Sequence, residues 1–245
     1  MSSGYYAACT GLVARTAALD TIANNLANVS TPGFRASHNK FSAVLASTGS
    51  TQLSVENQDI NDYGVMSGTR LDTTQGALTL TANSLDVAVE GPGYFTVQTA
   101  SGDVYTRGGS FRVSAKGQLT TPAGDPVLGD NGPITIAGQP ISISEDGTIS
   151  SNGAISGRLK LVEFAPNVEL QSMGGTYYSA PVGSEAAATK SKVRQGMLES
   201  SNVNPVSSVV ELITAQREVE SMRHALTMFN SEMDKTASQD LPRVS

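Results

Sequence analysis

The residue types that most often carry out chemistry in proteins are sparse in this chain. It has one cysteine, Cys9, and two histidines, His38 and His224, which lie far apart in the sequence. Metal sites and catalytic centres bring several histidine, cysteine or carboxylate side chains together, and no such grouping is evident in the 245 residues. The sequence therefore predicts no catalytic residue, no metal site, no cofactor and a protein that is not an enzyme.

Two stretches come closest to known ligand-binding loops. Gly91-Pro92-Gly93 begins like a dinucleotide-binding loop, but Thr96 stands where the third glycine is required. The stretch that begins at Asp59 has part of the spacing of a calcium loop, but Arg70 occupies the position of the final glutamate ligand. We interpret the first stretch as a turn between strands and expect no calcium site in the second.

The most unusual polar residues are three asparagines, Asn24, Asn25 and Asn28, within a stretch of helical apolar spacing. Asparagine is a poor residue for the interior of a helix, and Pro32-Gly33 ends the helix shortly afterwards. The amides can cap the last turns, or they can hydrogen-bond across a helix interface and fix its register. The second interpretation predicts a helix that must dock in one position, as in a subunit of an ordered polymer.

These amides lie beside one of two heptad seams, one at each end of the chain. From Tyr5 to Leu26, and again from Leu212 to Met233, small or apolar residues recur at alternating spacings of three and four. Such spacing is typical of a coiled coil. The residues expected to form the assembly interface are Leu12, Leu19, Ala23, Asn24, Asn25, Leu26, Asn28, Leu212, Val219, Met222, Leu226 and Phe229.

The seams predict two long helices. We expect the first over residues 3–28 and the second over residues 205–236. Asn204 is a suitable N-cap for the second helix, and Pro205 suits its first helical position, where the missing N–H costs nothing.

The middle of the chain has the features of β structure. Short runs of alternating hydrophobicity, such as SLDVAV at 84–89, are separated by turn pairs such as Lys116-Gly117 and Asp146-Gly147. The fold class is therefore α+β, with long terminal helices that form a coiled coil and a central all-β domain. The expected order is 1–41 N-terminal helix and turn, 42–74 extended connector, 75–185 β-domain, 186–204 return segment and 205–245 C-terminal helix.

Charge and hydropathy exclude several classes of partner. With 16 basic and 22 acidic residues the net charge is −6, which argues against nucleic acid. No apolar run approaches the about 18 residues of a membrane span. The first twenty residues lack a basic segment followed by an apolar one, so we expect no conventional cleaved signal peptide.

Several motifs resemble one family. ANNLANVSTPGF at 23–34 and LESSNVNPV at 198–206 resemble the terminal signatures of bacterial flagellar rod and hook proteins, and SLDVAVEGPGYFTV at 84–97 is similar to part of their β-domain. The resemblance covers most of the chain. It implies a structural subunit of the basal-body rod in the periplasm, which binds copies of itself and other rod proteins, and leaves the cell through the flagellar type III export apparatus. It also implies that the terminal helices form an inner tube of coiled coils.

Within the family, two features of the sequence distinguish proximal from distal rod subunits. The interval between Phe41 and Asp86 is short for a distal rod subunit, and GRLKLV at 157–162 is more similar to proximal rod subunits. A distal rod or hook-type subunit is the alternative. From another class, a secreted carbohydrate-binding or adhesive β-module would need exposed aromatic rings, whereas the alternation around Tyr94, Phe95 and Tyr105 predicts that most rings are buried.

Overall fold

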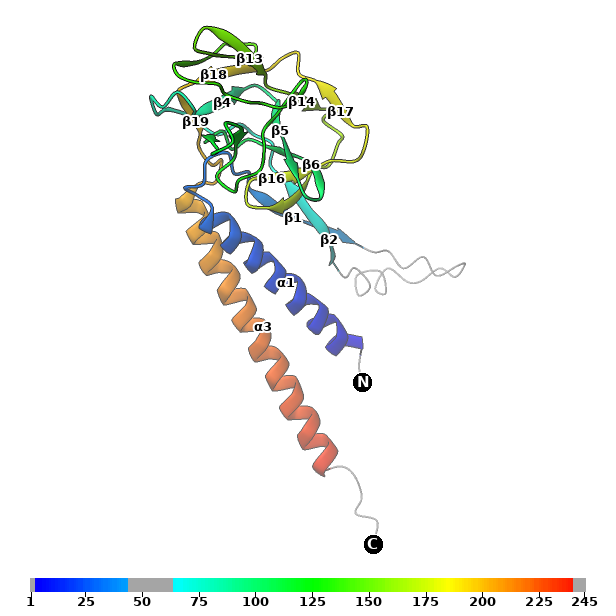
Figure 1. Cartoon of the computed structure of the whole chain (residues 1–245). Coiled ribbons are helices and arrows are strands. Elements are labelled where there is room, and N and C mark those ends of the chain that lie inside the picture. Colours follow the sequence, from blue (N-terminus) through cyan, green and yellow to red (C-terminus); the bar gives the residue numbers. More distant parts are fainter. Residues whose placement is uncertain (1–2, 44–63, 240–245) are drawn as a thin grey trace. The chain divides into compact units, whose positions relative to one another are not determined.

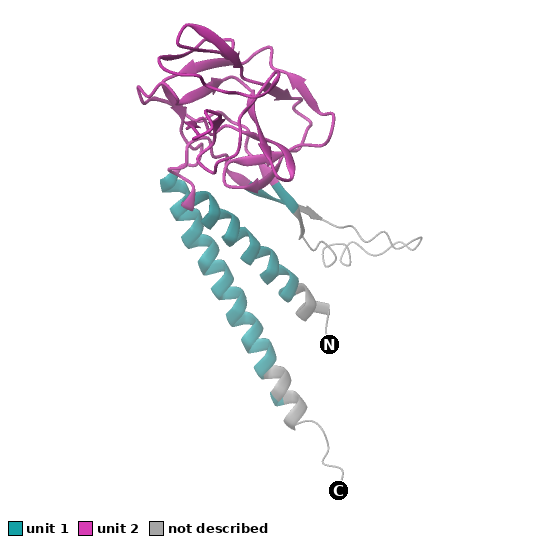
Figure 2. Cartoon of the chain, in the orientation of Figure 1, with its two compact units in different colours: residues 1–26, 38–69, 205–245 teal, residues 27–37, 70–204 magenta. Residues whose placement is uncertain are grey.

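The computed structural model describes residues 3–43 and 64–239, and the chain in it forms two compact units. Unit 1 comprises residues 1–26, 38–69 and 205–245, and unit 2 comprises residues 27–37 and 70–204 (Figures 1 and 2). Residues 44–63 of the expected connector lie outside the described residues. The α+β class is confirmed, since two helices flank a region of short strands in the sequence.

Both terminal helices form where the heptad seams predict them. Helix α1 spans Ser3–Ala27 and helix α3 spans Pro205–Gln239, which begins at the expected proline. Helix α1 ends before a turn in which the Thr31 N–H donates to the Asn28 carbonyl at 3.1 Å, as the following Pro-Gly pair demands. Neither described helix is long and apolar enough to cross a bilayer.

Nineteen strands lie between the helices in the described part of the chain. The first ten are β1 (Ser37–Ala43), β2 (Gly64–Leu71), β3 (Leu78–Leu80), β4 (Val87–Glu90), β5 (Tyr94–Thr99), β6 (Gly102–Thr106), β7 (Arg112–Val113), β8 (Leu119–Thr120), β9 (Leu128–Gly129) and β10 (Gly132–Pro133). The others are β11 (Ile141–Ile143), β12 (Thr148–Ser151), β13 (Ala154–Arg158), β14 (Leu161–Phe164), β15 (Gln171–Gly174), β16 (Tyr177–Ser179), β17 (Glu185–Ala187), β18 (Lys192–Gln195) and β19 (Met197–Glu199).

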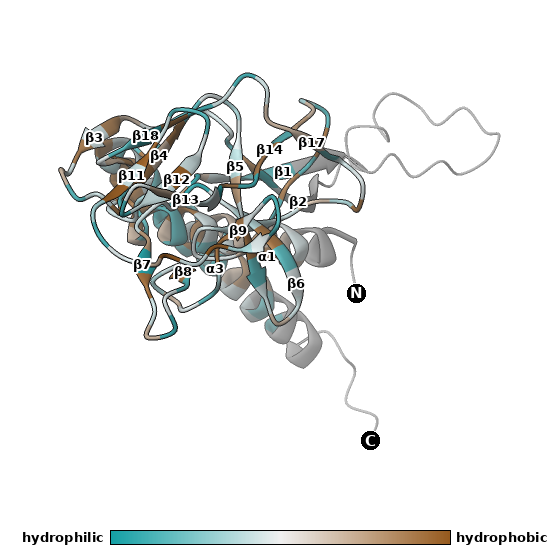
Figure 3. Cartoon of the chain, turned by 45° about the horizontal axis from the view of Figure 1, so that its top comes forward, coloured by the Kyte–Doolittle hydropathy of each residue, from teal (hydrophilic) through white to brown (hydrophobic). Residues whose placement is uncertain are grey.

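Unit 2 is organised around a six-stranded sheet with the order β15-β16-β6-β5-β14-β17. Strands β11, β12 and β13 form a second sheet, and smaller pairs join β18 to β4 and β19 to β3. Every strand pair with a recorded register is antiparallel, which matches the many short turns of the sequence. Hydrophobic residues recur along the strands of this unit, including β4 and β14 (Figure 3).

The six-stranded sheet separates two hydrophobic clusters. On β5, Tyr94 belongs to a cluster with Tyr105, Val162 and Tyr178, whereas Phe95 belongs to a cluster that also holds Phe111. Successive side chains of a strand point to opposite faces, so both faces of β5 are covered. For the same reason β4 departs from simple alternation: Val87, Ala88 and Val89 are all buried.

Unit 2 is wider than the β-domain expected at 75–185. It takes in the expected return segment, because β18 pairs with β4 and β19 pairs with β3. It also takes in residues 27–37, where Phe34 and Ala36 pack against Val203. The end of the expected connector is also ordered, as β2 pairs with β1.

Phe95 offers a direct test of the packing of unit 2. Phe95 is fully buried and contacts Phe111 edge-on, with the ring centroids 5.1 Å apart. We expect Phe95→Ala to lower the free energy of unfolding by about 3–5 kcal/mol through the lost contacts and the cavity. Ile155→Ala, at a side chain that is 78% exposed, should change it by less than about 0.5 kcal/mol. Urea denaturation measures both, and equal effects would contradict this description of the core.

Candidate functional site

One face of α3 is buried within the chain. Ala215, Val219 and Leu226 are buried, and Leu212 and Met222 at the same spacing are half-buried. These positions follow the expected spacing of three and four. The residues predicted from the C-terminal seam therefore lie together, except Phe229, whose side chain is 57% exposed.

Helix α1 packs against this face in the antiparallel direction. Arg15 forms an ion pair with Glu218, and a methyl group placed on Gly11 would lie 3.7 Å from Met222 Cε. From Gly11 to Arg15 the chain advances four residues along α1, whereas the contacted residue on α3 changes from Met222 back to Glu218. Contacts that run in opposite directions along the two helices show that the helices are antiparallel. At the distance of 3.7 Å a methyl group on residue 11 would make an ordinary van der Waals contact with Met222.

A second face of α3 carries apolar side chains that are exposed. Val206, Val210 and Ile213 have 74%, 59% and 46% of their surface accessible, at spacings of four and three. Val209 beside them is also exposed, as are Met228 and Phe229 farther along the helix. We call Val206, Val209, Val210 and Ile213 the outer stripe. Seam spacing alone did not identify this face.

The N-terminal residues expected at an interface have unequal environments. Leu12, Leu19, Leu26 and Asn28 are half-buried, Asn25 is buried, and Ala23 and Asn24 are exposed. The Asn28 side-chain oxygen accepts a hydrogen bond from the Thr31 hydroxyl at 3.2 Å. This contact joins Asn28 to the turn that follows α1.

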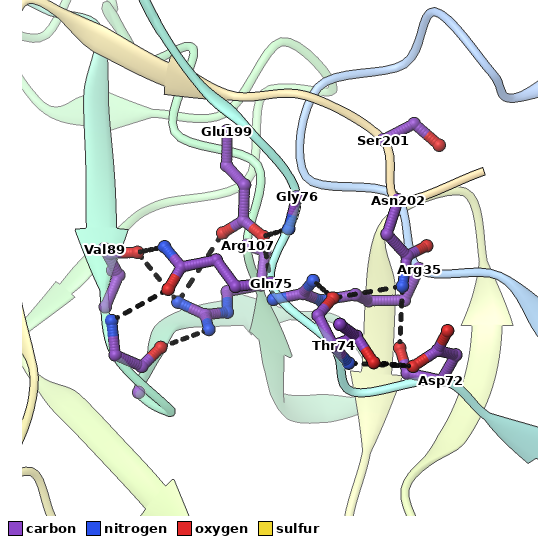
Figure 4. Close-up of polar contacts among 12 residues, drawn as sticks. Arg35, Asp72, Thr74, Gln75, Gly76, Val89, Arg107, Glu199, Ser201 and Asn202 are labelled. Carbon is purple, nitrogen blue, oxygen red and sulfur yellow. Dashed lines mark hydrogen bonds and ion pairs between the residues drawn. The ribbon is translucent and has the colours of Figure 1, made fainter. Parts of the chain in front are cut away.

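The strongest polar feature is a buried charge cluster in unit 2, formed by Arg35, Arg107 and Glu199 (Figure 4). The Arg35 Nη2 lies 2.7 Å from Glu199 Oε1, and both side chains are at most 1% exposed. The Arg107 Nη1 lies 3.6 Å from the other carboxylate oxygen. Charges are rarely buried unless they are paired, so this cluster fixes three distant segments at one point.

The cluster has two guanidinium groups and one carboxylate. Backbone carbonyls compensate for the excess positive charge. Arg107 donates to the carbonyl oxygens of Val89, at 3.1 Å, and Gly91, and Arg35 donates to that of Thr74. The Arg107 guanidinium also lies 5.0 Å from the centre of the Tyr94 ring, an attractive cation–π geometry. Burial nevertheless lowers the pKa of Arg107, against the opposing effect of Glu199.

Two glycines allow the backbone to approach this cluster closely. Gly33 has φ +75, and a Cβ atom there would lie 2.3 Å from the backbone of Arg107 and Gly108. A Cβ atom on Gly76 would lie 2.0 Å from the Ser200 carbonyl oxygen. The glycine of the Pro-Gly turn is therefore needed for close packing as well as for ending the helix.

Sequence reasoning did not identify the three charged residues. Single arginines and glutamates in a chain are mostly exposed, and nothing in their local spacing indicates burial. The available signal was their place in the motifs: Glu199 lies within LESSNVNPV, and Arg35 follows ANNLANVSTPGF. A charged residue within or beside such a motif was the available indication that its side chain is buried.

Three family profiles match separate parts of the chain. The profile "Flagella basal body rod protein" matches residues 6–35, "Flagellar hook protein FlgE/F/G D1 domain" matches 88–151, and "Flagellar basal body rod FlgEFG protein C-terminal" matches 194–239. Each matched segment supplies one member of the charge cluster, namely Arg35, Arg107 and Glu199 respectively.

Curated relatives match nearly end to end. The flagellar basal-body rod protein FlgF of Caulobacter vibrioides is 33% identical, over 93% of both chains. The FlgF protein of Salmonella typhimurium is 38% identical, over 84% of this chain and 85% of its own. The chain belongs to the flagellar basal-body rod protein family. The rod protein FlgG of Buchnera aphidicola from Acyrthosiphon pisum is 33% identical, over 96% of both chains.

For this rod-family chain, Glu199→Gln tests the charge cluster. The variant keeps the shape of the side chain but leaves two buried guanidinium groups without their carboxylate. We expect the free energy of unfolding to fall by about 3–5 kcal/mol, measured by urea denaturation. Glu145→Gln is the control, because Glu145 bonds Lys192 and Arg194 on the surface. A loss no larger than that of the control would contradict the role of the cluster.

The raised pKa values of Tyr177 and Tyr178 determine how the free energy of unfolding depends on alkaline pH. Burial raises the pKa of Tyr177 from 10.0 to about 12, and Asp125, which accepts a hydrogen bond from its hydroxyl group, also raises it. Burial likewise raises the pKa of Tyr178, whose hydroxyl accepts the Arg35 N–H. The folded state therefore favours the neutral phenols. Their contribution is complete below about pH 10, the unfolded value, and is lost as the pH rises through the folded values.

We expect the free energy of unfolding to decline from about pH 10 to about pH 12. Urea denaturation at several pH values measures it, and phenolate absorbance follows the titration. Tyr177→Phe should make the decline shallower. A flat profile over this range in the unmodified chain would contradict the assignment.

Proposed function

We propose that this chain is a structural subunit of the flagellar basal-body rod, the shaft that crosses the periplasm and transmits torque. The observation that carries the proposal is the end-to-end similarity to rod proteins, together with a charge cluster that joins the three matched segments. Its partners would be copies of itself, other rod proteins and the type III export apparatus, which would export it without a cleaved signal peptide.

The lengths of two of the FlgF alignments favour the FlgF branch. The match to the Buchnera FlgG protein extends over 258 aligned positions, more than the 245 residues of this chain, so FlgG carries residues that this chain lacks. The matches to the Caulobacter and Mesorhizobium FlgF proteins extend over 232 and 240 positions. We therefore propose a proximal rod subunit, with a FlgG-type subunit as the alternative.

The burial of aromatic rings gives no support to an adhesive β-module. Tyr94, Phe95, Tyr105, Phe111 and Tyr178 are each at most 6% exposed. A carbohydrate-binding surface needs such rings on the outside, where they can stack on sugars. These rings instead fill the two clusters of unit 2, so they serve folding.

Assembly would use the outer stripe together with the expected interface residues. Val219 and Leu226 are already covered within the chain, whereas Val206, Val209, Val210 and Ile213 leave apolar surface near the start of α3 for a neighbour. Met228 and Phe229 expose further apolar surface along the same helix. A contact between this stripe and a different surface of the next subunit would not close on itself, and such contacts generate filaments. In the assembled rod the terminal helices would form a coiled coil with their neighbours.

Val210→Asp tests this division of α3 into two faces. Because Val210 is 59% exposed in the single chain, we expect thermal unfolding of the monomer to change little. Incorporation into rods should be lost, because the charge would be buried without a partner. Complementation of a strain that lacks this chain, with isolation of its basal bodies, measures incorporation.

Two further variants complete the test. Ala225→Asp places the same charge at an exposed position on another face of α3 and should assemble normally. Val219→Asp, on the buried face, should destabilise the monomer itself. Normal rods with Val210→Asp would show that the outer stripe is not the assembly surface.

A further inference from the structure

The covalent connections between the two units originate at one place in unit 2. The chain passes between the units four times, after residues 26, 37, 69 and 204. The segments of unit 2 next to these crossings include Ala36, Asp72 and Asn202. The Asp72 N–H donates to the Ala36 carbonyl at 2.8 Å, so two of the four connections are bonded directly.

The Asn202 side chain makes three hydrogen bonds to two of the other connecting segments. Its side-chain oxygen accepts the Ala36 N–H at 2.7 Å. Its amide nitrogen donates to the carbonyls of Asp72 and Thr74, each at 3.1 Å (Figure 4). All three bonds go to backbone atoms. An aspartate at this position could accept but could not donate, and leucine could do neither.

The remaining connection joins the same place through packing. Val29, near the first crossing, packs against the cluster of Phe34, Ala36 and Val203. Close by, the Gly33 N–H donates to the Glu199 carbonyl at 2.7 Å, and the Asn202 N–H donates to the Phe34 carbonyl at 3.4 Å. The first bond joins residues 33 and 199, and the second joins the later residues 34 and 202. Residues 33–36 and 199–202 therefore run parallel.

We propose that Asn202 is the positioning residue of a mechanical clamp, formed by Arg35, Ala36, Asp72, Thr74, Glu199 and Asn202. Tension that enters unit 2 from α1 crosses the clamp at 33–36 and leaves through 199–204 toward α3. The residues between, which form the two hydrophobic clusters, are bypassed. Because the two segments are parallel and are pulled from opposite ends, their bonds are loaded together instead of one after another.

This inference rests on the proposed role of the chain in a torque-carrying shaft, but its test uses the isolated full-length chain. The chain is held by its two termini at constant force, and the lifetime of the folded state is measured. We expect rupture in one step that releases the segment between the two sides of the clamp. Asn202→Leu should shorten that lifetime roughly 10- to 100-fold, because three hydrogen bonds are lost.

Gln195→Leu is a closely matched control. The Gln195 side chain also accepts one backbone N–H, from Ile143, and donates to two carbonyls, those of Ser84 and Ile141. Both variants therefore lose three bonds of the same kind within unit 2. A residue that only stabilises the fold would show equal effects at both positions. The clamp predicts a shorter lifetime for Asn202→Leu, while Gln195→Leu stays within about twofold of the unmodified chain.

Asn202→Asp provides a second variant, which keeps the acceptor for Ala36 and should give an intermediate lifetime. Equal lifetimes for the Asn202 and Gln195 variants would overturn the proposal. Rod incorporation of the unmodified chain is measured separately. A chain that shows the mechanical difference but does not enter rods would refute the proposed function and leave the clamp intact.

Discussion

The Glu199 carboxylate lies buried between the guanidinium groups of Arg35 and Arg107, and the arrangement of unit 2 depends on it. Removing charges from water is costly, and a buried ion pair repays that cost only with good geometry and further hydrogen bonds. Here those bonds come from the backbone carbonyls of Thr74, Val89 and Gly91. The cost has a structural consequence, because any alternative packing that separates the three residues leaves a charge buried alone.

The cluster brings together segments that the chain order separates widely. Arg35 follows the first helix, Arg107 lies after β6 and Glu199 ends β19, shortly before the second helix. Their meeting explains why residues 27–37 belong to unit 2 although the rest of the N-terminal end does not. In a polymer subunit, this arrangement fixes where both ends of the chain leave the β structure, so that every copy presents them identically.

Local sequence patterns predicted the elements well where local forces decide them. The heptad spacing and Pro205 predicted both helices to within about three residues, and turn pairs predicted the β class. Patterns failed where distant contacts decide. Strand β1 is polar in sequence and becomes a strand by pairing with β2, and Ala88 is buried because β4 is covered on both faces. Burial of Arg35 and Glu199 follows from contacts 164 residues apart, which no local window contains. The predicted residues Leu212, Val219, Met222 and Leu226 lie on one face of α3, and their role in assembly stays a prediction. The outer stripe was missed because heptad spacing does not distinguish an internal seam from an external one.

A double-mutant cycle between Arg35 and Glu199 tests the central claim most directly. Arg35→Met and Glu199→Leu are made singly and together, and urea denaturation gives each free energy of unfolding. Glu199→Leu leaves two buried guanidinium groups without a carboxylate, and Arg35→Met leaves Glu199 with only the longer Arg107 contact, at 3.6 Å. If the pair holds the segments together, the double variant is less destabilised than the sum of the two by about 2–3 kcal/mol. Additive effects within about 0.5 kcal/mol would contradict the account, because they would mean that the two residues contribute independently and do not join the two ends of the chain.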